Sequence, residues 1–197
     1  MRHFSTSPGR SERGMTLVEL LIVMAIMGVV VGGITMSFVS QRKITAIQNQ
    51  RATLIQQAQA AMDLVTRELR TAGTNPTGAA FVPVTYNASQ LEIRADLNGN
   101  GTTDTNNDPN EHLIYAYDNA NKRITRDAGS GAQTLVENIQ NFTVIYLDSA
   151  ETPTTVSSAV RQFQVTITAQ TAAPDPTYRV NNGYRTFSIT SFIRLRN

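Results

Sequence analysis

The chain has 197 residues, no cysteine and two histidines, and its formal net charge at pH 7 is +2. That length allows one domain with its own core and one extended element, and the lack of cysteine excludes disulfides, thiolate metal sites and cysteine nucleophiles. Residues 1–14 hold three arginines and one glutamate, which account for the whole net charge. The remainder has no basic stripe, so nucleic acid is not an expected partner.

The first predicted element is a membrane-spanning helix. No charged residue occurs from 20 to 41, and a helix of that length covers roughly the 30 Å hydrocarbon core of a bilayer. The arginines before it predict a cytoplasmic N-terminus, with everything after about Gln41 outside the cytoplasm. A secretory signal peptide has a shorter apolar region and a small-residue cleavage site, which residues 37–41 do not offer.

An acid, Glu19, lies within this apolar run, close to its N-terminal edge. A carboxylate buried unpaired in lipid is destabilising by several kcal/mol, so acids in spanning segments usually mark function. A plain single-pass anchor does not explain it. The alternative is that Glu19 only reaches back to the membrane surface from a lone anchor.

Residues 14–23, GMTLVELLIV, resemble the processing motif of type IV prepilins. In that family a membrane peptidase cleaves after the glycine and methylates the new N-terminus, and an acid lies fifth from the cut. The resemblance implies that Gly14 precedes the cut, that Met15 is the N-methylated first residue, and that Glu19 is the assembly acid. Methionine stands here where the family usually has phenylalanine.

The motif agrees with a simple electrostatic argument. A carboxylate in lipid needs a cation, and the α-amino group freed by cleavage of a neighbouring subunit is a compact one. We therefore expect Glu19 to pair with that amine and to set the register of the subunits in a filament.

Beyond Gln41 the helix is predicted to continue and to become amphipathic. Apolar residues recur near a 3.6-residue spacing, at Ile44, Ile47, Leu54, Ala58, Ala61, Met62, Val65 and Leu69. Gly73 favours the helix end there, with Arg67 and Arg70 in the last turn and Pro76 just beyond. The apolar stripe must be covered, and we expect a sheet to cover it.

Short β-like runs bounded by turn residues fill the rest of the chain. They lie at residues 81–86, 90–95, 113–117, 122–126, 135–147, 160–170 and 186–195, and the turn at 118–121 predicts a hairpin. The fold class is therefore α+β, a long N-terminal helix packed on an antiparallel β-sheet head, which resembles the type IV pilin fold. The expected organisation is a leader (1–14), a hydrophobic helix (15–41), an amphipathic helix (42–73) and a β-rich head (74–197).

The polar loop at residues 96–111, DLNGNGTTDTNNDPNE, matches the first half of a calcium-binding loop. Glycine occupies position six, and oxygen-bearing side chains occupy positions one, three, five and nine. The candidate Ca²⁺ ligands are Asp96, Asn98, Asn100 and Asp104.

The match fails at position twelve, where Asn107 replaces the bidentate glutamate. Asp108 or Glu111 is the alternative source of that carboxylate. The competing interpretation is a solvated turn, because Asp, Asn, Gly and Thr are also the residues of turns. Calcium binding would order the loop and raise the melting temperature of the head.

Catalysis is not expected. His3 belongs to the predicted leader, and His112 follows Glu111 at the start of a predicted strand, where an exposed or hydrogen-bonded histidine is the common outcome. No glycine-rich phosphate loop, nucleophile elbow or zinc-protease motif occurs. The chain is expected to be a substrate of enzymes and to be no enzyme itself.

The head also resembles, more weakly, PilW-type minor pilins, at residues 67–73, at 135–139 leading to Tyr146, and at 194–197. The resemblance implies a structural subunit that enters or primes a type IV pilus. Its partners would be other pilins, a prepilin peptidase with methyltransferase activity and an inner-membrane assembly platform. Before assembly it would be inserted in the inner membrane with its head outside the cytoplasm, and afterwards it would lie in a surface pilus.

Two other functions stay open from the sequence. A J-type pseudopilin of type II secretion has a similar layout and would act in a periplasmic pseudopilus. A calcium-ordered adhesin head on a single-pass anchor, which never polymerises, is the third possibility.

Overall fold

The computed structural model describes residues 14–103 and 109–195, which form two compact units divided after Ala46. One helix, α1 (Leu17–Thr71), contributes its N-terminal part to the first unit and its C-terminal part to the second. Residues 1–13 of the predicted leader, His3 included, and the loop positions Asp104 and Asp108 lie outside the described residues.

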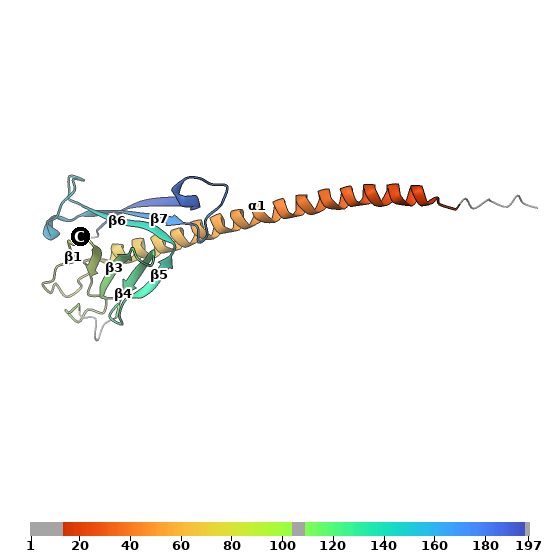
Figure 1. Cartoon of the computed structure of the whole chain (residues 1–197). Helices are drawn as coiled ribbons and strands as arrows, with labels where there is room; N and C mark the ends of the chain where they lie inside the picture. The colour runs from red at the N-terminus through yellow and green to blue at the C-terminus, as the bar shows by residue number, and fades with distance from the viewer. Residues whose placement is uncertain (1–13, 104–108, 196–197) are drawn as a thin grey trace, which may run out of the picture. The chain divides into compact units, whose positions relative to one another are not determined.

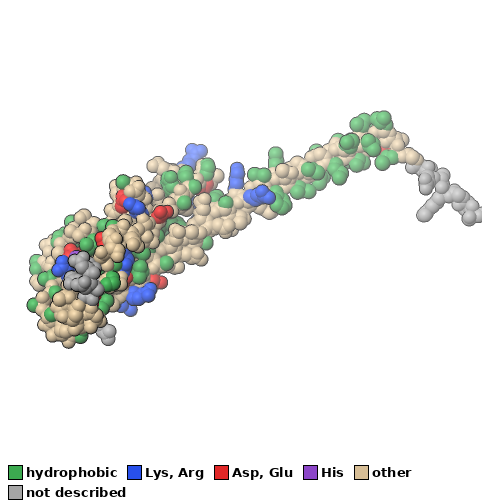
Figure 2. Space-filling model, turned by 90° about the horizontal axis from the view of Figure 1, so that it is seen from below, with side chains coloured by type: hydrophobic (Ala, Val, Ile, Leu, Met, Phe, Trp, Pro, Cys, Tyr) green, Lys and Arg blue, Asp and Glu red, His purple; other side chains and the backbone are tan. Residues whose placement is uncertain are grey.

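Every residue from Gly14 to Ala46 in the first unit is exposed. Figure 2 shows hydrophobic side chains along the N-terminal part of the helix, and the large ones there are mostly more than half exposed. Among the described residues, α1 is the one helix long and apolar enough to span a bilayer. An uncovered apolar helix of this kind needs lipid or other helices around it.

The second unit contains two antiparallel sheets, which Figure 1 shows as separate layers beside the C-terminal part of α1. The larger sheet has the order β1-β2-β3-β4-β5 and the smaller has β6-β7-β8. The strands are β1 (Val84–Thr85), β2 (Gln90–Arg94), β3 (His112–Asp118), β4 (Arg123–Asp127), β5 (Gln133–Glu137), β6 (Ile139–Leu147), β7 (Gln162–Gln170) and β8 (Thr186–Arg194). The predicted α+β fold, a long helix on antiparallel β-structure, is confirmed.

One predicted strand, residues 135–147, is wrong as a single element. It is two strands, β5 and β6, that belong to different sheets and meet at Asn138, whose φ is 59°. Asparagine tolerates this left-handed conformation better than most residues. The Asn138 carbonyl accepts from the Gln170 N–H at 2.8 Å, and the Ile139 N–H donates to the Lys122 carbonyl at 2.8 Å. These bonds fix the point where the chain leaves one sheet for the other.

The core of the second unit lies between the helix and the two sheets. Six of the eight apolar residues of the predicted stripe are buried there: Leu54, Ala58, Ala61, Met62, Val65 and Leu69. Ile44, which belongs to the first unit, is 53% exposed. The helix ends at Thr71, and Gly73 follows with a φ of +80° and donates its N–H to the Arg94 carbonyl at 2.9 Å. The glycine is therefore needed for the left-handed turn that ends the helix.

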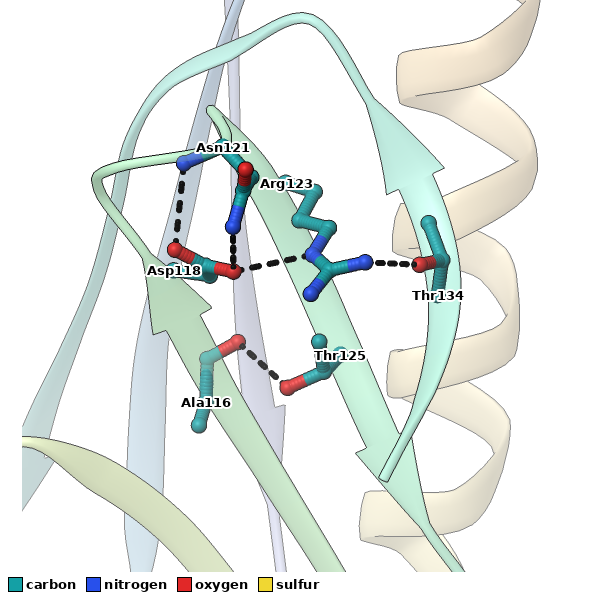
Figure 3. A network of polar contacts seen from close by, with 6 residues as sticks. All are labelled: Ala116, Asp118, Asn121, Arg123, Thr125 and Thr134. Atoms are coloured by element: carbon teal, nitrogen blue, oxygen red, sulfur yellow. Dashed lines mark hydrogen bonds and ion pairs between the residues drawn. The ribbon is translucent and has the colours of Figure 1, made fainter. Parts of the chain in front are cut away.

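The predicted β3–β4 hairpin is present and is closed by one carboxylate (Figure 3). Asp118 accepts from the Asn121 backbone N–H at 3.1 Å, from the Asn121 amide at 2.7 Å and from the Arg123 Nε at 2.9 Å. The Asn121 bonds, supported by Arg123, lower the pKa of Asp118 to about 2. Arg123 also donates to Thr134 Oγ1 at 3.0 Å, which ties the turn to β5.

A second carboxylate, Asp175, holds the connection between β7 and β8. It accepts from the Thr177 hydroxyl at 2.6 Å and from the Arg185 Nε and Nη2 atoms at 3.1 and 2.8 Å. These contacts, the Thr177 hydroxyl first, lower the pKa of Asp175 to about 2. Gly183 packs against the same turn with a φ of +88°, where a Cβ atom would lie 2.9 Å from Pro174 Cβ.

We expect Asp175 to make the head sensitive to acid. Its folded-state pKa is below the ordinary value of 3.8, so the stability it contributes is complete above that value and is lost as the pH falls towards about 2. Melting temperatures between pH 5 and pH 2 should therefore fall less steeply for Asp175→Asn than for the wild type. Equal slopes for the two proteins would contradict this assignment.

Candidate functional site

The predicted processing region forms a capping box at the start of α1. The Thr16 N–H and the Thr16 hydroxyl both donate to Glu19 Oε2 at 2.9 Å, and the Glu19 N–H donates to Thr16 Oγ1 at 3.3 Å. This reciprocal arrangement satisfies two backbone donors that a helix start otherwise leaves without partners. Glu19 therefore has a local partner in the isolated chain, and its carboxylate is exposed.

Gly14 and Met15 precede this cap in an exposed, non-helical stretch. A Cβ atom added at Gly14 would meet nothing within 4 Å, and its φ is not in the left-handed region. The fold of the chain thus gives no reason for glycine at this position.

A partly buried polar cluster that we did not predict joins the helix to the larger sheet. Arg126 on β4 donates from Nη2 and Nε to the two carboxylate oxygens of Glu68 on α1, at 2.8 and 3.1 Å. The Tyr115 hydroxyl donates to the same carboxylate, and Arg126 also donates to Asn110 Oδ1 at 2.7 Å. Burial, followed by the hydrogen bond to Glu68, raises the pKa of Tyr115.

This cluster was missed because Glu68 and Arg126 are 58 residues apart in sequence. The available signal was weak: Glu68 precedes Leu69, a member of the buried stripe, and so lies near the edge of the packed helix face. Such a position does not identify the cationic partner.

The polar loop after β2 is organised around Asp96, which is fully buried. Its oxygens accept from the Gly99 N–H at 2.7 Å, the Gly101 N–H at 3.0 Å and the Thr77 hydroxyl at 3.1 Å. Asn98 Oδ1 accepts from the Asn100 N–H at 2.8 Å. Within the described ranges, no group of three or more His, Cys, Asp or Glu residues is placed to hold a metal ion.

His112 lies at the start of β3, and its Nε2 atom is 2.9 Å from Glu92 Oε1 on the neighbouring strand. His112 is therefore hydrogen-bonded, which is one of the two outcomes expected from the sequence.

The exposed apolar helix, capped by an acid in its first turn and continuing into an antiparallel β-head, defines the class of type IV pilin-like proteins. Residues 9–35 match the model of the prokaryotic N-terminal methylation motif, and residues 47–186 match the model of prepilin peptidase-dependent protein B. Because this second match covers more than half of the chain, the protein belongs to the prepilin peptidase-dependent protein B family. This is a pilin-like structural family and not a known enzyme family.

Among solved structures, the chain is similar to a type IV-like pilin from Thermus thermophilus, with 14% sequence identity and a TM-score of 0.46. That similarity covers 72% of this chain and 96% of the other. No curated protein matches the sequence.

Proposed function

We propose that this protein is a minor pilin: it is cleaved after Gly14, N-methylated at Met15 and incorporated by its apolar helix into a type IV pilus, which it helps to initiate. The observation that carries the proposal is the helix part from Leu17 to Ala46, which is exposed on every side and holds a single acid, Glu19. Such a helix needs an apolar surrounding, and a filament core made of similar helices supplies it.

The charge of Glu19 explains how subunits take one register. In a lone subunit the Thr16 N–H and hydroxyl are its partners, and neither carries a charge. Transfer of the carboxylate into a dry filament core favours a cation, and the α-amino group freed at Met15 of a neighbouring subunit is the one that cleavage produces. The family's dependence on a prepilin peptidase, stated in its description, supports this order of events.

The proposal places the chain in the inner membrane before assembly, with its head outside the cytoplasm. Its partners there are the prepilin peptidase, the other pilins and the assembly platform. The N-terminal methylation motif at residues 9–35 and the membrane-length apolar helix support this location.

Pili sheared from cells and a deletion strain test this function. We expect the processed chain in the purified filaments at low abundance, and a marked fall in the number of pili per cell after deletion. Filaments that lack the chain, together with an unchanged pilus number, would exclude the proposed role. Recovery of the chain in a short periplasmic assembly, with loss of protein secretion after deletion, would assign it to a pseudopilus instead.

A further inference from the structure

Two buried carboxylates converge on the loop that follows β2. Asp96 is fully buried, and Glu111, immediately before β3, is only 2% exposed. The Ala95 N–H donates to the Glu111 carbonyl at 2.8 Å, so antiparallel pairing brings the two ends together. The Glu111 side chain then reaches the loop itself, because its Oε1 atom accepts from the Leu97 and Asn98 N–H groups at 2.7 and 3.0 Å.

Two buried side-chain polar atoms have no hydrogen-bond partner among the described residues, Arg94 Nε and the second oxygen of Glu111, Oε2. A buried carboxylate oxygen without a partner is strongly destabilising, and such an atom in a native fold is usually accounted for by a bound ion or water.

The loop is rich in acids, and two arginines beside it pair with other acids: Arg94 with Glu92, and Arg126, which also contacts Asn110, with Glu68. No lysine or arginine occurs from residue 95 to residue 121, a stretch that contains five acids. In the part of the chain that the structure describes, neither Asp96 nor Glu111 takes part in an ion pair. The N–H groups of Gly99 and Gly101 compensate the Asp96 charge only in part, because each carries a partial positive charge.

We propose that a divalent cation of the calcium type binds where residues 96–103 meet Glu111, with Glu111 Oε2 and the Asp96 carboxylate as its charged ligands. The amide oxygens of Asn98 and Asn100 are further donors, and water completes a coordination shell of six to eight oxygens of the kind that Ca²⁺ takes. Oxygen-only ligands on a short loop favour this hard cation over transition metals.

In this assignment Glu111 supplies the carboxylate that is missing at position twelve of the loop. Asn107 stands at that position in the sequence, and Glu111, immediately before β3, contacts the loop in its place. The left-handed φ angles of Gly99 (+78°) and Gly101 (+82°) form the turn that wraps around Asp96. The site does not depend on which filament takes up the subunit, so its test is independent of the proposed function.

The direct test uses the full chain, purified in detergent and stripped of metal with EDTA. Equilibrium dialysis with radioactive calcium should show one calcium ion bound per chain at saturation. Extracellular calcium modules bind with dissociation constants on the order of 10⁻⁴–10⁻³ M. At roughly ten times that concentration the melting temperature should rise by about 4 °C, and sodium chloride of equal ionic strength should not reproduce the rise.

The variant Glu111→Gln separates the ion from the local structure. Its amide oxygen can still accept from the Leu97 and Asn98 N–H groups, but the negative charge is gone. We therefore expect the calcium-dependent rise to disappear, while the melting temperature in EDTA stays the same or increases. Asp127→Asn is the matched control, because Asp127 Oδ1 also accepts from two glycine N–H groups, at 2.8 and 3.1 Å, away from this loop.

Two results would overturn the proposal. The first is no calcium bound to the wild-type chain, which would leave Glu111 Oε2 to water or to a proton. The second is the same calcium-dependent rise in Glu111→Gln as in the wild type. The dialysis needs no variant, so the proposal stays testable even if Glu111→Gln fails to fold.

Discussion

Replacing Glu19 with alanine is expected to reduce incorporation into filaments by a hundredfold or more, while cleavage after Gly14 and folding of the head continue. Removing one partner of a buried charge pair costs about 3–5 kcal/mol, and each 1.4 kcal/mol is a factor of ten in an equilibrium. The head is unaffected because Glu19 lies in the first unit, and its hydrogen bonds all go to Thr16. Quantitative immunoblots of sheared filaments against whole cells measure the loss.

A second variant, Glu19→Gln, separates the charge from the helix cap. Glutamine can replace glutamate in a capping box, so the bonds to Thr16 are kept and the negative charge is lost. We expect Glu19→Gln to fail in assembly as Glu19→Ala does. Normal incorporation of Glu19→Gln would mean that capping is the role of this residue and that no intersubunit charge pair exists. Asp63→Ala, an exposed acid on the same helix, is the control and should assemble normally.

Arg126→Ala is expected to lower the free energy of unfolding of the head by about 1–3 kcal/mol, because it leaves the largely buried Glu68 carboxylate without its cation. The Arg126 and Glu68 side chains are only 21% and 16% exposed, so water screens the pair weakly. The cluster also joins the helix to the sheet, and its loss should weaken the contact between α1 and β4. Urea unfolding followed by tyrosine fluorescence measures the change, since all six tyrosines lie between residues 86 and 184 and the chain has no tryptophan.

Arg123→Ala provides the matched control for this prediction. Arg123 is on the same strand and pairs with Asp118 at 2.9 Å, but its side chain is 38% exposed. Exposed pairs of this kind contribute about 0–1 kcal/mol, so Arg123→Ala should have a smaller effect. Similar losses for Arg123→Ala and Arg126→Ala would show that burial of the Glu68 pair adds nothing.

The parts of this protein that could be predicted from sequence are the parts encoded locally. The apolar run, the acid at Glu19 and the helix end at Gly73 each depend on residues within a few positions of one another. The hairpin closed by Asp118 is equally local, because its partners are three and five residues away. Local hydrogen bonding and periodicity are enough to read such features.

The features that were missed depend on contacts between distant segments. Nothing in the sequence marks Asn138 as the point where one strand ends and another sheet begins, because asparagine is also common in ordinary turns. The Glu68–Arg126 pair depends on how the strands are paired. Strand pairing is set by the whole core, so the partners of these side chains are not visible in their own neighbourhoods.

We propose that cleavage after Gly14 frees an amine that neutralises Glu19 of an adjoining subunit. The most direct measurement is the intact N-terminal mass of the chain isolated from cells with an active prepilin peptidase, with Gly14→Val as the uncleaved reference. We expect a polypeptide that begins at Met15 and carries one added methyl group. A polypeptide that still begins at Met1 would contradict it.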